Sequence, residues 1–275
     1  MDYEGHLERL LRVATCLAAC GYAAQVGALA GTARAFYDDA QVWGAQARHR
    51  GASGRTHLMH AAWSGNTARV QFLLGRGVAV DAREARGGTA QTAACHNGHL
   101  ETARYLVECG GASVNAAMIN GVTALMAGCF FGHLETVRFL VERGGASVNA
   151  AMIDGTTALL SASCMGHLGI ARYLVEHGGT NVDAARTADG TTALLFASYF
   201  GYTEIVRCLV ERGGANVNAA TFHGFTALME ASAQGHLAIV HFLLQRGADK
   251  HALNGAGETA HALAASHPLV QAALA

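Results

Sequence analysis

The chain contains almost no lysine and carries little charge of either sign. Lys250 is its one lysine, charged residues make up 14% of its 275 residues, and the formal net charge is -1. General binding to nucleic acids or to acidic lipids needs a basic patch, and this composition makes no case for one. We therefore expect neither a nucleic-acid partner nor a membrane partner.

Long apolar runs and disulfide-type cysteine spacing are absent as well. No stretch is apolar enough to span a bilayer, and the N-terminal part has no basic start followed by a clean apolar run. The 7 cysteines are an odd number without a C-x-x-C pair, which favours a reducing compartment. These absences predict a cytoplasmic protein, with the nucleus as an alternative, and we expect a monomer.

What the chain does contain is a repeat. A threonine recurs with gaps of 33, 34, 34, 35, 34 and 33 residues, at Thr56, Thr89, Thr123, Thr157, Thr192, Thr226 and Thr259. Periods of this size are typical of stacked-repeat architectures. Such proteins usually present a long surface to a partner, rather than a pocket for chemistry.

The third copy, residues 121–149, shows what one unit predicts. Thr123 can cap a helix that runs to about Phe130, and Gly132 can end it in a left-handed conformation. A second helix follows, with Glu135 in its first turn and an apolar stripe formed by Leu134, Val137, Leu140 and Val141. Two helices of this length cannot bury their apolar faces alone, so the copies must stack into one core.

This unit resembles the ankyrin repeat, whose usual pattern is G-x-T-P-L-H-x-A-A-x-x-G-H-L-E-x-V-x-x-L-L-x-x-G-A-D-V-N. The resemblance covers about residues 52–275 in seven copies, the last one truncated. It implies an all-α solenoid of helix-turn-helix units with projecting β-hairpin-like loops, over residues 51–275. The family's proline after the threonine is replaced, by His57 in the first copy and by Ala90, Ala124, Ala158, Ala193, Ala227 and Ala260. Alanine still suits the first turn of a helix.

Repeat position also explains most residues that could carry chemistry. His99, His133, His167 and His236 share one slot, so they would lie roughly 10 Å apart. That is too far to share a metal at about 2 Å per ligand bond, and we expect structural hydrogen bonds instead. Cys95 and Cys129 share a slot with Ser163, Ser198 and Ser232, which favours a small core residue over a nucleophile. We predict no catalytic residues, no metal, no cofactor and no enzymatic activity.

The positions that the repeat leaves variable are the candidates for binding a partner protein. In ankyrin stacks the concave face consists of the loop tips and the outer residues of the first helix. Large apolar residues fill these slots in the middle of the array, and they mark binding surfaces. The predicted contact residues are Trp63, Phe130, Phe131, Met165, Tyr199 and Phe200 at the helix ends, and Ile119, Ile153, Phe222 and Phe225 at the loops. Met118 and Met152, by contrast, are expected to pack on neighbouring loops.

Residues 1–50 do not carry the repeat pattern. They resemble an F-box in the order and spacing of Leu10, Leu11, Val13, Leu17, Val26, Leu29, Phe36 and Trp43, although the family's early Leu-Pro is missing. The resemblance implies that these residues contact the adaptor of a cullin-type ubiquitin ligase, which makes the chain a substrate receptor. The alternative is a small helical module that caps the open end of the array. For the whole chain we predict a protein-protein interaction module, with the ubiquitin-ligase substrate receptor as the alternative.

Overall fold

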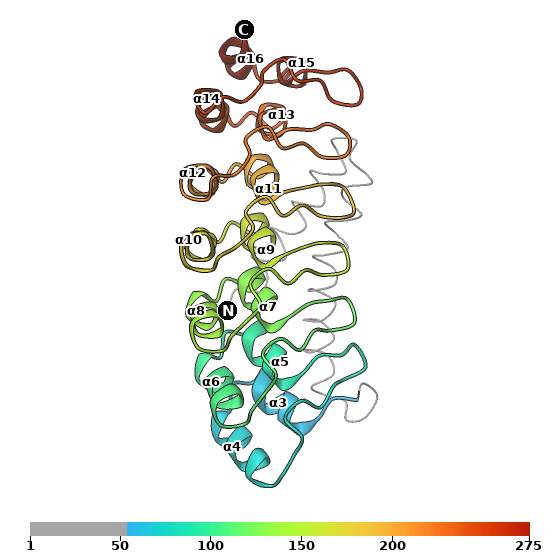
Figure 1. Ribbon diagram of the computed structural model, residues 1–275, viewed down its shortest axis with the longest axis vertical. Coiled ribbons are helices and arrows are strands. Elements are labelled where there is room, and N and C mark those ends of the chain that lie inside the picture. The colour runs from blue at the N-terminus through green and yellow to red at the C-terminus, as the bar shows by residue number, and fades with distance from the viewer. Residues whose placement is uncertain (1–53) are drawn as a thin grey trace. The chain divides into compact units, whose positions relative to one another are not determined.

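The computed structural model describes residues 54–275, in which two columns of helices alternate along the chain (Figure 1). The first helices of the seven pairs are α3 His57–Trp63, α5 Ala90–His96, α7 Ala124–Phe131, α9 Ala158–Cys164, α11 Ala193–Tyr199, α13 Ala227–Ala233 and α15 Ala260–Leu263. The second helices of the pairs are, in the same order, α4 Thr67–Gly75, α6 Leu100–Glu108, α8 Leu134–Glu142, α10 Leu168–His177, α12 Thr203–Glu211, α14 Leu237–Gln245 and α16 Pro268–Leu274. The expected all-α solenoid is confirmed, since the described residues contain no β-strand beyond two isolated bridges.

Each recurring threonine caps the first helix of its pair. The Thr123 hydroxyl accepts a hydrogen bond from the Met126 amide at 3.3 Å, and the same bond recurs at all seven threonines over 3.2 to 3.4 Å. This bond satisfies one of the amides that a helix N-terminus leaves without an intrahelical partner. The period of the sequence is therefore the period at which a new helix begins.

The glycine between the two helices and the histidine that follows it link neighbouring repeats. Gly132 ends α7 with φ 84°, and the imidazole of His167 from the next repeat lies against it. His167 Nε2 lies 2.9 Å from the carbonyl oxygen of Phe130. The equivalent contacts of His99, His133 and His236 measure 2.9 to 3.0 Å, which confirms the structural role expected of these four histidines. His267, which was not among the four, makes the same contact at 3.2 Å.

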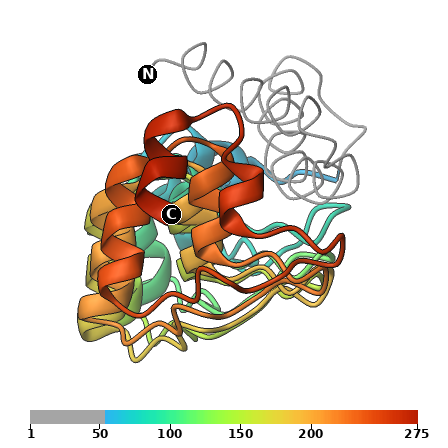
Figure 2. The ribbon, with the colours of Figure 1, turned by 90° about the horizontal axis from the view of Figure 1, so that it is seen from above.

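The loops join into a second continuous system beside the helices. Within one loop, the Met152 amide donates to the Thr156 carbonyl at 2.9 Å, closing a tight hairpin-like turn. Between loops, the Ile153 amide donates to the Asn120 carbonyl at 3.1 Å, and each further pair of neighbouring loops has an equivalent bond. Figure 2 looks along the array and shows the loops projecting to one side, nearly superimposed. The loops therefore present equivalent residues in rows.

Candidate functional site

The residue that opens each loop turn is buried, whatever its chemistry. This entry slot holds Glu84, Met118, Met152, Arg186, Thr221 and Asn254, and all six are buried. Three of the polar members, Glu84, Thr221 and Asn254, accept hydrogen bonds from amides of their own turn. The Glu84 carboxylate, for example, accepts from the amides of Arg86 and Gly88, both at 3.0 Å. The expected packing of Met118 and Met152 on neighbouring loops agrees with this burial. The entry slot therefore belongs to the interior of the loop system.

The next residue of each loop points outward and forms an exposed row. We call Ile119, Ile153, Thr187 and Phe222 the tip row. Its large apolar members are 71%, 76% and 70% exposed, respectively. In the first and last described loops the same slot holds Ala85 and Gly255. Because the row pairs repeat after repeat through backbone hydrogen bonds, its apolar side chains are held at fixed positions over the middle of the array.

The aromatic residues at the helix ends differ from the expectation. Phe130 is 3% exposed and Tyr199 is 8% exposed, so these two side chains are buried and offer little surface to a partner. This corrects the prediction that they form an exposed contact surface, because both side chains turn inward at the ends of their helices. Half-buried positions are found for the other predicted residues of this group and for one loop residue: Trp63, Phe131, Met165, Phe200 and Phe225.

Ring contacts connect the helix ends of the first three repeats. The His96 ring lies 4.8 Å from the Trp63 ring and 3.9 Å from the Phe131 ring, measured between centroids. Burial lowers the pKa of His96 to about 3, so its imidazole is neutral near pH 7. A neutral ring packs between two aromatic side chains without a desolvated charge. His96 therefore acts here as a core aromatic residue.

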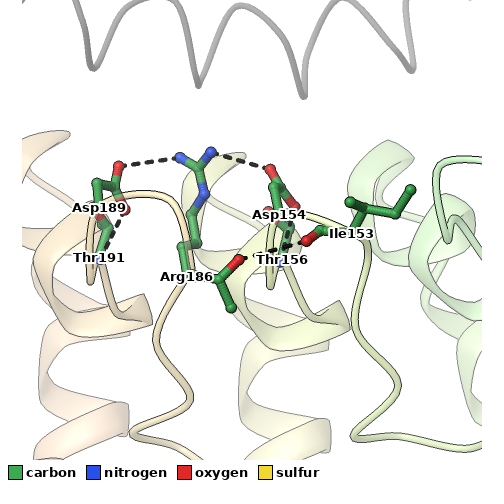
Figure 3. Close-up of polar contacts among 7 residues, drawn as sticks. Ile153, Asp154, Thr156, Arg186, Asp189 and Thr191 are labelled. Carbon is green, nitrogen blue, oxygen red and sulfur yellow. Dashed lines mark hydrogen bonds and ion pairs between the residues drawn. The ribbon is translucent and has the colours of Figure 1, made fainter.

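A buried ionic network lies beside Ile153 of the tip row (Figure 3). Arg186 is 2% exposed, and its guanidinium donates to Asp154 Oδ2 at 3.0 Å and to Asp189 Oδ2 at 3.4 Å. The other oxygen of each carboxylate accepts a backbone amide two residues on, from Thr156 at 3.0 Å and from Thr191 at 2.9 Å. Each aspartate thus closes its own turn and binds the arginine at the same time.

This network was not singled out from the sequence. Two signals could have revealed it. The spacing of 35 residues between Thr157 and Thr192 marks a longer loop, and both aspartates occupy the turn slot that Asn120 fills in the loop before Asp154. Only the fold shows that the side chains meet across two loops.

A second residue that the sequence did not single out is Glu230, on α13. Its side chain has no hydrogen bond or ion pair within the described part of the chain, and it is 7% exposed. Burial raises the pKa of Glu230 to about 8. The carboxyl group is therefore largely protonated near neutral pH.

The remaining chemistry of the described residues is that of a core. Cys95 and Cys129 are fully buried, and burial raises the pKa of both thiols. A thiol held in its protonated form is a poor nucleophile, which supports the expected role as small core residues. Within residues 54–275, no group of three or more His, Cys, Asp or Glu residues is arranged to hold a metal ion. In the same range, no helix has the length and apolar character needed to cross a bilayer.

Comparisons with known proteins agree with this geometry. A family model described as ankyrin repeats (3 copies) matches residues 20–118, 58–152, 117–185 and 179–254. No curated protein matches the chain. The ankyrin repeat domain of Bcl-3, described as a unique member of the IkappaB protein family, is 28% identical with a TM-score of 0.70, covering 81% of this chain and 99% of that one. The human ASB11 ankyrin repeat domain is 27% identical with a TM-score of 0.69, covering 80% of this chain and 96% of that one.

The F-box-like residues predicted in the N-terminal segment, from Leu10 to Trp43, lie outside the described residues. The family match gives no support to an F-box there or to a ubiquitin-ligase role, and its first segment begins at residue 20.

Proposed function

Since the chain belongs to the ankyrin-repeat family, whose arrays generally serve as protein-protein interaction modules, we propose that it binds a partner protein along the tip row. The observation that carries the proposal is the exposure of Ile119, Ile153 and Phe222, each above two thirds, in one slot of the middle loops. Apolar side chains that gather on a surface mark interaction sites more often than isolated ones do.

The binding free energy available from the tip row is too small for a stable complex, so the partner should cover more than the tip row. Full burial of one large apolar side chain contributes roughly 1.5 to 3 kcal/mol. Three such residues barely offset the roughly 4 to 15 kcal/mol that association loses in translational and rotational freedom. The half-buried side chains of Phe131, Met165 and Phe200 are the natural extension of the contact, because they come from the same repeats.

Polar residues beside the tip row would form the rim of the contact. Arg83 and Arg86 are exposed on the first described loop, and the Arg86 carbonyl accepts a hydrogen bond from the Ile119 amide. Complementary charges at the rim contribute mainly to specificity and to the association rate. No covalent step is proposed, since this fold is generally a non-enzymatic scaffold.

The proposal is tested by affinity capture with the full chain as bait and mass spectrometry as the readout. The test variant combines Ile119→Ser, Ile153→Ser and Phe222→Ser. The matched control combines Phe72→Ser and Leu269→Ser, which are 63% and 73% exposed but lie on α4 and α16, outside the tip row. We expect the wild type and the control to capture the same protein and the test variant to lose it. Capture that persists in the test variant contradicts the proposal, as does equal loss in the control.

A further inference from the structure

One loop of the array is longer than its neighbours at the tip. The spacing from Thr157 to Thr192 is 35 residues, and the additional residue, Ala188, lies in the turn. In the loop before it, the amide of the tip-row residue Ile153 donates a hydrogen bond to the Asn120 carbonyl of the preceding loop. The carbonyl of the next residue, Asp154, accepts the hydrogen bond from the following loop. In the longer loop these two functions are separated: Thr187 donates, and Asp189 accepts from Phe222.

This separation weakens the connection between the two sides of the tip row. Where donor and acceptor are adjacent, one peptide unit transmits the position of one loop to the next. With Ala188 between them, and exposed, the turn gains two further backbone dihedral angles. Backbone hydrogen bonds from the Arg186 amide to the Thr191 carbonyl and from the Gly190 amide to the Arg186 carbonyl, both at 2.9 Å, close the turn. Neither bond involves Thr187 or Asp189, so a further contact is needed to fix the position of Asp189 relative to Thr187.

Arg186 supplies that connection. Its guanidinium reaches back to Asp154, in the preceding loop, and forward to Asp189, beyond the inserted residue. It also lies 6.0 Å from the ring centre of Phe196 on α11. The planar group has fixed donor directions, so pairing with two carboxylates constrains both loops in angle as well as in distance. Two loops of ordinary length have Met118 and Met152 in this slot, where packing alone is sufficient.

We propose that Arg186 is a positioning residue that holds Phe222 in line with Ile153 across the longer loop. Its importance for partner binding rests on the proposed function, but the contact itself does not. A buried ion pair is a poor source of stability, since desolvation opposes the attraction between the charges. Geometric control of the loops is what an apolar residue in this slot could not provide.

Backbone hydrogen exchange measured by NMR tests the inference without any partner. In Arg186→Met, the amides of Thr187 and Phe222 should exchange about ten-fold faster or more, because their bonds to Asp154 and Asp189 open locally. The amides of Ile119 and Gly255 make equivalent bonds in other loops and serve as internal controls. Equal acceleration of all four amides would show global destabilisation instead and would overturn the proposal.

A second variant separates positioning from simple charge neutralisation. Arg186→Met combined with Asp154→Asn and Asp189→Asn reproduces the uncharged chemistry of the loop that contains Met118 and Asn120. We expect exchange at Thr187 and Phe222 to remain fast, because no side chain then joins the preceding loop to residue 189, and the two backbone bonds that close the turn do not reach the preceding loop. Restored protection would mean that Arg186 only neutralises the two carboxylates, which refutes the inference. Deletion of Ala188 in this triple variant should restore protection, since the turn then has the ordinary length.

These measurements and the capture experiment can fail independently. Unchanged exchange in Arg186→Met rejects the positioning role and leaves the interaction proposal intact. Partner capture that persists in the tip-row variant rejects the proposed function, but it does not affect the connection between the loops that hydrogen exchange measures.

Discussion

The helical stack and the loop system both join one repeat to the next, but they do so with different residues. In the stack, each slot repeats one residue type: threonine at the cap, glycine at the turn and, in most repeats, histidine across the joint. In the loops, the entry slot is always buried but holds glutamate, methionine, arginine, threonine or asparagine. The backbone conformation at a helix end suits few residue types, whereas several kinds of side chain can fill a small space between loops. The repeats of this chain therefore resemble one another in the stack and differ in the loops.

The largest expected loss of stability comes from substituting a glycine between the two helices of a repeat, where the histidine of the next repeat packs. Gly132→Ala should destabilise the protein by about 2 to 5 kcal/mol, since φ 84° costs a non-glycine residue about 1 to 2 kcal/mol and the new Cβ would lie 2.6 Å from the His167 ring. Gly145→Ala shares a positive φ of 67° but meets no atom within 4 Å, so it should lose only the backbone part. Gly75→Ala lies in open space at the end of α4 and should be neutral or slightly stabilising. Urea unfolding of the three variants measures the order, and equal losses would show that the ring contact contributes nothing.

A pH-dependent effect should come from Glu230 in the stack. The unfolded chain releases this proton near pH 4.5, whereas the folded chain keeps it up to about pH 8. Between these values the folded state binds more protons, so the contribution of Glu230 to stability falls as pH rises. Glu230→Gln removes this loss and should be more stable than the wild type by up to about 3 kcal/mol at pH 7.

The thermal midpoint followed from pH 4 to pH 8 checks this prediction. The difference between Glu230→Gln and the wild type should be close to zero at pH 4 and should grow steadily above pH 5. A difference that does not depend on pH would mean that the Glu230 carboxyl group titrates normally in the folded protein.

A smaller effect is expected at the helix caps. Thr123→Ala removes the 3.3 Å bond to the Met126 amide and should reduce stability by about 1 kcal/mol. Thr123→Ser keeps a hydroxyl in place and should recover most of the loss. Unfolding in urea would measure both variants. Equal stability of the alanine and serine variants would show that the hydroxyl does not act as a cap.

The smallest effect on stability should come from the tip row. Ile153→Ser and Phe222→Ser should each change the free energy of unfolding by no more than about 0.5 kcal/mol, because both side chains are mostly exposed. Scanning calorimetry of each variant provides the check. A clear loss of stability at either position would place it with the stack, and the contrast between the two regions would not hold there.

The parts of the protein that could be predicted from the sequence are those where one residue type has one backbone role. Thr123 and Gly132 mark the start and end of a helix by their own conformational preferences, so their recurrence predicted the pairing of the helices and the position of the loops. The same reasoning predicted the histidine contacts, because His133 and His167 occupy one slot. It could not separate Phe130 from Phe131: adjacent residues at a helix end differ in burial by their direction, which depends on the neighbouring helix.

The sequence by itself determined the period, the helix boundaries and the family, because these depend on local preferences that repeat seven times. Only the tertiary structure decided which variable side chains face outward and which meet inside. Arg186 and Asp154 are 32 residues apart, and Glu230 is buried without a neighbouring charge, so no local pattern reveals either environment. Contacts between repeats depend on how neighbouring units stack, and that arrangement exists only once those repeats have folded against each other.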